Sequence, residues 1–176
     1  MAERTLTIVL MAGSTGTGKS TLAGNLSLAL GWPVVDKDTP KSTLIAGGVA
    51  EQIAAPLAYD LMFAQTKDVL GQGFSVILDS PASFPQSVDN ARRLAEDASA
   101  RLRVVLCTAG VTLRETRLRE RSPRLSQPSV PDERPMNEAQ RYAHLPSDTL
   151  TVDTGLSADD VLATVRAYVL GDAAPT

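Results

Sequence analysis

Residues 8–26, IVLMAGSTGTGKSTLAGNL, place a glycine-rich loop between an apolar run and a segment with helical character. Gly13, Gly18, Lys19 and Ser20 match the pattern G-x-x-x-x-G-K-[ST], which carries meaning only between a strand and a helix. Glycines let the backbone wrap around phosphate oxygens, so that successive N–H groups and the helix N-terminus point at the anion. A glycine-rich turn is the alternative, but the strand and helix context favours nucleotide binding.

The side chains of this loop have separable roles. We expect Lys19 to reach the β and γ phosphates, Ser20 to coordinate magnesium, and Thr21 to donate to the α phosphate. The backbone of the loop would supply the other phosphate contacts, and it comprises Gly13, Ser14, Thr15, Gly16, Thr17 and Gly18. The sequence therefore predicts ATP and Mg²⁺ as cofactors.

Apolar, β-rich runs alternate with helical patterns along the rest of the chain. We expect strands at residues 5–13, 33–36, 74–80, 102–109 and 149–154. Helices are expected at residues 18–30, 51–70 with an early break at Pro56, 87–100 and 112–121, and a last one opens with Ser157 and Asp160 at capping-box spacing. Strands that alternate with helices predict an α/β fold, in which helices cover both faces of a parallel sheet.

Composition limits the number of domains, the partners and the compartment that this chain can have. The 176 residues, 43% of them hydrophobic, fit one compact domain over residues 1–176. A formal net charge of −3 and a pI near 5.2 argue against a general polyanion binder, so we do not expect nucleic acid as a partner. A single cysteine, Cys107, excludes an internal disulfide framework and predicts a reducing compartment, the cytoplasm. The apolar run near the N-terminus is too short to span a bilayer, so we expect no membrane or targeting segment.

Missing motifs narrow the nucleotide-binding classes further. A regulatory GTPase needs Asn-Lys-x-Asp after a strand, and this chain has no such motif. It also needs Asp-x-x-Gly after its third strand, where this chain has DSPA. Large mechanical ATPases need a longer chain. A small kinase needs a catalytic base and a lid, and this sequence offers candidates for both.

The segment VVDKDTPKSTL, residues 34–44, holds the candidates for the base. A carboxylate at the end of the second strand would face the γ phosphate across the crevice at the carboxyl ends of the strands. We expect Asp38 to orient the acceptor hydroxyl and accept its proton, with Asp36 the second candidate in this acceptor site. A solvated turn is the alternative for this segment. Lys41 could hold an anionic group of the substrate or be a surface lysine.

A third acidic residue, Asp79, closes the strand FSVIL. An acid at this position of a buried strand would support magnesium, directly or through water. Capping of the following SPASFP turn is the alternative.

Cations for the transferred phosphoryl group are expected in a lid at about residues 114–140. The candidates are Arg114, Arg117, Arg119, Arg121 and Arg124. Spacings of four and three place Arg117, Arg121 and Arg124 on one helical face or at its end. We expect Arg117 and Arg121 to be the catalytic pair, delivered when the proline-rich segment closes. Some of these arginines could instead pair with Glu115 and Glu120 on a solvated face.

Together, the motifs resemble those of small P-loop kinases, the group of polynucleotide 5'-hydroxyl kinase, chloramphenicol phosphotransferase, gluconate kinase and the zeta toxins. The segments that carry this resemblance are GSTGTGKS, VVDKDTPKSTL, SVILDS, LCTAGVTLRETRLRERSPR and LTVDT. The resemblance spans about residues 5–170 and implies a five-stranded parallel sheet of order 2-3-1-4-5. It also implies that Asp38, preceded by the basic Lys37, is the base, and that Arg117 and Arg121 lie in the lid.

These patterns predict an ATP- and Mg²⁺-dependent phosphotransferase that acts on a hydroxyl of a small molecule, such as a metabolite, a nucleoside or an antibiotic. A polynucleotide 5'-hydroxyl kinase is one alternative, and a non-catalytic ATP-binding regulatory or resistance module is another. The acceptor, the preference between ATP and GTP and the oligomeric state stay open.

Overall fold

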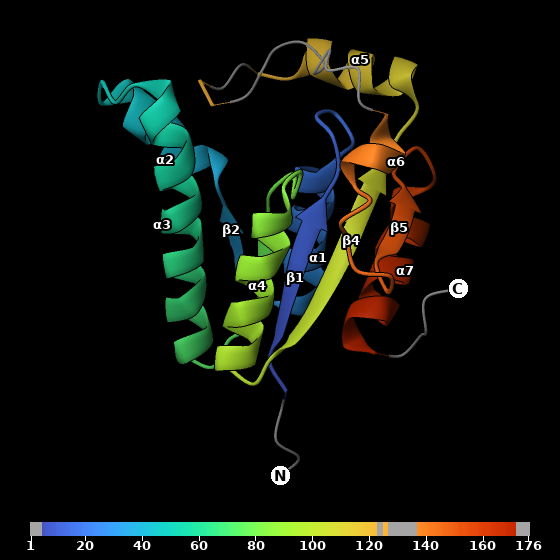
Figure 1. Ribbon diagram of the computed structural model, residues 1–176. Coiled ribbons are helices and arrows are strands. Elements are labelled where there is room, and N and C mark those ends of the chain that lie inside the picture. Colours follow the sequence, from blue (N-terminus) through green and yellow to red (C-terminus); the bar gives the residue numbers. More distant parts are fainter. Residues whose placement is uncertain (1–4, 123–124, 127–136, 172–176) are drawn as a thin grey trace.

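The computed structural model describes residues 5–122, 125–126 and 137–171 (Figure 1). Its centre is a five-stranded sheet of order β2-β3-β1-β4-β5 in which each pair of neighbours is parallel. The strands are β1 (Thr7–Ala12), β2 (Val34–Asp36), β3 (Val76–Asp79), β4 (Arg101–Thr108) and β5 (Leu150–Asp153). The predicted order of the sheet is confirmed.

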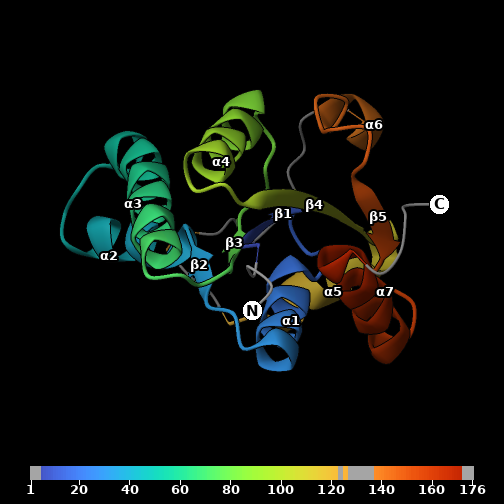
Figure 2. The ribbon, with the colours of Figure 1, turned by 90° about the horizontal axis from the view of Figure 1, so that it is seen from below.

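Helices cover both faces of the sheet, as expected. They are α1 (Lys19–Leu30), α2 (Asp38–Ala46), α3 (Glu51–Gly71), α4 (Pro85–Asp97), α5 (Val111–Glu120), α6 (Glu138–Arg141) and α7 (Ala158–Leu170). Figure 2 shows α3 and α4 on one face and α1 and α7 on the other. In Figure 1, α5 lies across the end of the sheet to which the strands point. Within the described part of the chain, no helix has the length and apolar character needed to cross a lipid bilayer.

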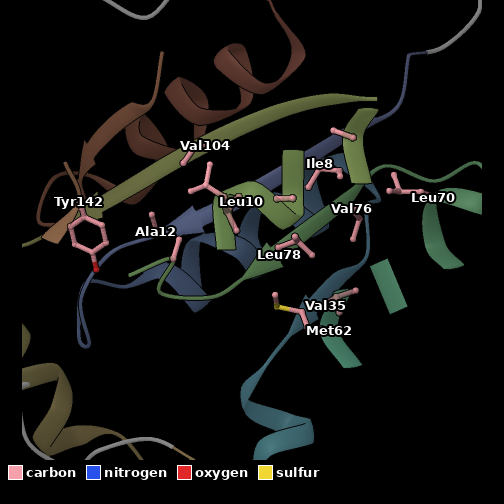
Figure 3. Packing of buried hydrophobic residues seen from close by; sticks show 14 residues of the cluster. Ile8, Leu10, Ala12, Val35, Met62, Leu70, Val76, Leu78, Val104 and Tyr142 are labelled. Atoms are coloured by element: carbon pink, nitrogen blue, oxygen red, sulfur yellow. The ribbon is translucent and has the colours of Figure 1, made fainter. Parts of the chain in front are cut away.

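Strand β1 is the centre of the core, and all six of its residues are buried. Its side chains alternate between the two faces, so Ile8, Leu10 and Ala12 pack with residues of α3 and α4 (Figure 3). Val9 and Met11 pack with residues of α1 and α7 on the other face. A strand buried on both faces explains the continuous apolar run in the sequence.

The break expected at Pro56 is wrong, because α3 runs without interruption from Glu51 to Gly71. Proline removes a donor that would bond the carbonyl four residues earlier, here that of Gln52. Gln52 is exposed near the start of the helix, where water can satisfy its carbonyl. The buried face that includes Ala58 and Met62 then stabilises the continuous helix.

Two further details differ from the expectation. The stretch after β2 is not a turn throughout, because α2 begins at Asp38. Ser157 is the N-cap of α7, but its side chain makes no capping hydrogen bond, so the predicted capping box is wrong. Asp159 and Asp160 in the first turn instead place negative charge at the positive end of the helix dipole.

Candidate active site

The phosphate-binding loop (residues 13–21) connects β1 to α1 and packs against the ends of two other strands. The Gly13 N–H donates to the carbonyl of Pro81, 3.1 Å away, after β3. A Cβ atom on Gly13 would lie 2.4 Å from the carbonyl oxygen of Cys107 in β4. With φ at +136°, Gly13 also has a conformation that other residues rarely adopt. Packing and conformation therefore both require glycine here.

Lys19 is the first residue of α1, and its side chain folds back over the loop. Its Nζ donates to the Ser14 carbonyl at 2.9 Å, and the Thr17 hydroxyl donates to the same oxygen at 2.8 Å. Burial lowers the pKa of Lys19, while the nearby carboxylate of Asp79 opposes that effect. A partly buried ammonium with one carbonyl partner can take phosphate oxygens as further acceptors.

Ser20 and Asp79, the two expected metal ligands, lie close together beside Lys19. Burial raises the pKa of Asp79, and the hydrogen bond from Ser20 and the charge of Lys19 oppose that rise. A hydroxyl and a carboxylate are oxygen ligands of the kind that Mg²⁺ takes together with water and phosphate oxygens. These residues therefore fit a magnesium ion.

The two aspartates after β2 have different positions. Asp38 lines the cavity described below and forms an ion pair with Lys37, another lining residue. Asp36 is not among the described residues that line this cavity. Its carboxylate accepts hydrogen bonds from the Thr39 N–H at 2.7 Å and the Thr39 hydroxyl at 2.9 Å, which stabilises the start of α2. The structure thus brings Asp38 rather than Asp36 to the loop.

Lys41, a predicted substrate ligand, connects three segments. Its Nζ lies 2.8 Å from the Glu51 carboxylate in α3 and 3.4 Å from the Ser126 carbonyl. Lys41 is also absent from the described lining of the cavity, whereas Ser126 is part of it. These contacts give Lys41 a role in holding α2, α3 and the segment after α5 together.

Two arginines attach α5 to the phosphate-binding loop. Arg114 donates from Nε to the Thr15 carbonyl at 3.0 Å and from Nη1 to the Glu138 carboxylate at 2.9 Å. Arg117 donates to the Gly16 carbonyl at 3.4 Å. It also donates to the hydroxyl and the carbonyl of Thr154. Helix α5 is therefore positioned over the loop through two successive loop carbonyls.

The arginine candidates differ in their surroundings. Arg117 and Arg121 both line the cavity, as expected for cations that face a phosphoryl group. Arg119 is exposed and donates to the Thr116 hydroxyl at 3.3 Å. Arg124 lies outside the described residues.

One cavity of about 470 Å³ lies beside the phosphate-binding loop. Its lining includes the charged residues Lys37, Asp38, Asp79 and Arg121 and the apolar residues Leu22, Leu118 and Val161. Residues 15–21 of the loop, apart from Thr17, lie along it. This volume is within the range of small-molecule sites, about 300–1,000 Å³.

The sequence analysis did not identify Thr154 as a site residue. Its hydroxyl lies 2.8 Å from the Thr17 carbonyl and 3.2 Å from the Thr108 carbonyl, and it accepts from Arg117. Its position directly after β5 could have indicated a site residue, because the carboxyl ends of parallel strands meet at one edge of the sheet. Arg114 was a candidate cation, but its contact with the loop backbone was not foreseen.

Comparison with known proteins agrees with this geometry. A family model described as AAA domain matches residues 8–146. The chain belongs to this AAA domain family. The AAA domain is 29% identical over 130 residues, 67% of its length, to an uncharacterised protein of Mycobacterium tuberculosis. The match covers 26% of that relative, so the chain spans about a quarter of its length.

Solved structures share the fold of this AAA domain at low sequence identity. A candidate kinase of Chloroflexus aurantiacus has a TM-score of 0.72 and 19% identity, over 98% of this chain and 100% of the other. The APS kinase CysC of Mycobacterium tuberculosis, solved with AMPPNP and APS, has a TM-score of 0.65 and 17% identity, over 97% and 100%. These likenesses confirm the P-loop kinase fold.

Proposed function

We propose that this AAA domain transfers the γ-phosphate of ATP to a hydroxyl group of a small molecule. The observation that carries the proposal is that Asp38, Lys19, Ser20 and Asp79 line one cavity beside the phosphate-binding loop. A nucleotide-binding module that transfers no phosphate would not need a carboxylate opposite the loop. Asp38 is therefore the residue that points to transfer.

In the proposed reaction, the acceptor oxygen forms a bond to the γ phosphorus while the bond from that phosphorus to the bridging oxygen of ADP breaks. Lys19 and the backbone N–H groups of the loop hold the negative charge of the phosphates. Asp38 orients the acceptor hydroxyl and takes up its proton. The products are ADP and a phosphate ester.

Ser20 and Asp79 would hold Mg²⁺, which supplies charge neutralisation on the phosphate oxygens when bound. Arg121 and Arg117 are the proposed cations for the transferred group. Arg117 would have to exchange its contacts with Thr154 for phosphate oxygens, whereas Arg121 already lines the cavity. Lid rearrangement of this type is common among kinases.

The likeness to an APS kinase that binds AMPPNP supports ATP as the phosphate donor. The formal net charge of −3 supports a small-molecule acceptor rather than a nucleic acid or a membrane surface. We further propose that residues 1–176 act as one kinase domain with its lid at about 114–140, and that the protein works in the cytoplasm.

The test is ADP release from Mg·ATP in the presence of pools of hydroxyl compounds: sugars, nucleosides, amino alcohols, antibiotics and 5'-hydroxyl oligonucleotides. We expect one small-molecule pool to raise ADP release above the Lys19→Ala blank, and Asp38→Asn to abolish that increase while ATP still binds. Full turnover by Asp38→Asn would exclude Asp38 as the base. Stimulation by oligonucleotides alone would indicate a polynucleotide kinase. ATP binding without transfer to any pool would favour a regulatory module.

A further inference from the structure

The connection from β3 to α4 contains a strained residue, Ala82. Its φ of +46° lies in the left-handed region, which disfavours any residue with a Cβ atom. Ala82 is also completely buried, in the core on the face of the sheet that α3 and α4 cover. Strain of this kind persists only where neighbouring contacts impose it, and it concentrates at functional sites. The contacts that hold Ala82 therefore bear on the chemistry of the site.

The three residues before Ala82 belong to the site. Asp79, Ser80 and Pro81 all line the cavity beside the phosphate-binding loop. Asp79 is the expected metal ligand, and the Pro81 carbonyl accepts a hydrogen bond from the Gly13 N–H at 3.1 Å. Ala82 is not among the described residues that line the cavity. Because it directly follows this stretch, its backbone conformation sets how Asp79 to Pro81 meet the loop.

The backbone of Ala82 is held on both sides. Its N–H donates to the Ser80 hydroxyl at 3.3 Å, a contact within the connection itself. Its carbonyl oxygen lies 3.0 Å from Nε2 of His144, a residue 62 positions away in the sequence. A carbonyl only accepts, so Nε2 carries the proton of this hydrogen bond. His144 thus supplies a tertiary contact that favours the strained conformation of Ala82.

The segment that carries His144 is anchored by other side chains. Tyr142 is buried and packs in the same core cluster as Ala12 (Figure 3). Leu145, directly after His144, packs against that cluster as well. At the start of α6, Glu138 pairs with Arg114 at 2.9 Å. The imidazole of His144 can therefore be removed while its backbone stays in place.

We propose that His144 is a positioning residue for the metal side of the site. The inference rests on the proposed nucleotide-dependent function. By donating to the Ala82 carbonyl, His144 holds Ala82 in its left-handed conformation, which keeps the stretch from Asp79 to Pro81 against the phosphate-binding loop. His144 is not among the described residues that line the cavity, so it acts through Ala82 and not on the ligand.

Three substitutions separate this role from simple packing. His144→Leu removes the donor, whereas His144→Gln retains an N–H that can reach the same carbonyl. Ala82→Gly relieves the strain, because glycine adopts a positive φ without a steric penalty. Gln140→Leu is the matched control, since Gln140 lies in α6 of the same segment and is exposed.

The experiment is titration calorimetry of the whole chain with the ATP analogue AMPPNP, once with Mg²⁺ and once with EDTA. With Mg²⁺, we expect His144→Leu to weaken binding roughly tenfold, the lower end of the loss that follows removal of a partner behind a metal ligand. With EDTA the loss should be smaller, because Asp79 then has no metal to hold. His144→Gln should recover most of the affinity, and Gln140→Leu should bind as the wild type does.

A double variant tests the part played by the strain. In the Ala82→Gly protein there is less strain to hold, so adding His144→Leu should cost clearly less affinity than it does in the wild type. If His144 only packed its own segment, the effects of the two changes would add. A melting curve of each variant checks that it is folded.

The outcomes separate this inference from the proposed function. The inference is overturned if His144→Leu binds AMPPNP and Mg²⁺ as tightly as the wild type does. It is also overturned if the variant loses the same affinity with and without Mg²⁺ and His144→Gln recovers none of it, which would indicate a general structural role. In both cases, wild-type binding that depends on Lys19 leaves the proposed function standing. If the wild type does not bind AMPPNP, the proposed function itself is wrong and the inference fails with it.

Discussion

The guanidinium of Arg117 donates to both oxygens of Thr154, the hydroxyl at 2.9 Å and the carbonyl at 2.8 Å. The same hydroxyl lies 2.8 Å from the Thr17 carbonyl in the phosphate-binding loop. One threonine thus joins three segments that are distant in sequence: the loop, α5, and the connection from β5 to α7. We infer that Thr154 positions both the loop and α5.

Thr154→Val keeps the shape of this side chain and removes its hydrogen bonds. We expect the free energy of unfolding to fall by about 1–3 kcal/mol, because the Thr17 carbonyl and one Arg117 donor lose their partner. Affinity for ADP should fall as well. Chemical denaturation and calorimetry measure the two effects, and Thr154→Ser, which retains the hydroxyl, should recover most of both. A valine variant equal to the wild type would show that the loop holds its shape without Thr154.

The contact of Arg114 with Thr15 and Glu138 depends on the forked shape of a guanidinium. Arg114→Lys keeps the charge but cannot reach both partners in the same geometry. We expect this variant to weaken ADP binding, because the Thr15 carbonyl loses its donor. Glu138→Gln should have a smaller effect, since the Glu138 side chain is 40% exposed and such pairs contribute about 1 kcal/mol or less. Equal losses in the two variants would indicate that the ion pair, rather than the loop contact, matters.

Two glycines near the start of the chain should respond differently to alanine. Gly13→Ala would place a Cβ atom 2.4 Å from the Cys107 carbonyl oxygen, so we expect a loss of about 1–3 kcal/mol or more in unfolding free energy. Gly24 lies within α1 with no atom of another segment within 4 Å of an added Cβ. Gly24→Ala should therefore stabilise the protein by about 0.5–1 kcal/mol. Denaturant unfolding tests both, and a tolerated Gly13→Ala would show that β4 can move away.

Tyr59 should make stability depend on pH in the alkaline range. Burial raises its pKa from 10.0 to about 12, and the charge of Asp38 adds to that rise. The folded state therefore keeps the phenol proton between these values while the unfolded state loses it, so stability falls as the pH increases through this range. Tyr59→Phe removes this contribution. Subtracting its unfolding free energies from those of the wild type at pH 8–11 isolates the effect, and a constant difference would contradict it.

The residues of the loop could be predicted from local patterns, whereas the order of the sheet was implied by the resemblance to small P-loop kinases. An apolar strand, a glycine-rich loop and a helix carry their own signals, and the known crossover handedness limits how such units combine. Asp38 could be placed at the loop because it lies two residues after the end of β2. The predictions of the loop and of Asp38 need only residues that are close in sequence.

Hydrogen bonds and ion pairs between residues that are far apart in sequence could not be predicted in this way. Thr17 and Thr154 are 137 residues apart, and their contact exists only once β1 and β5 lie in one sheet. Lys41 pairs with Glu51 because α2 and α3 turn back on each other, which the sequence analysis did not anticipate. Pro56 was misjudged for a related reason, since the stabilising face of α3 comes from tertiary packing.

The attachment of α5 to the carbonyl oxygens of Thr15 and Gly16 has a consequence for how a ligand would arrive. Anions are bound by N–H groups, so an incoming phosphate would use other atoms of this short stretch of backbone than Arg114 and Arg117 do. Neither needs to displace the other from these atoms. The loop is held in shape from its carbonyl side before any phosphate is present, which lowers the conformational entropy lost when a nucleotide binds.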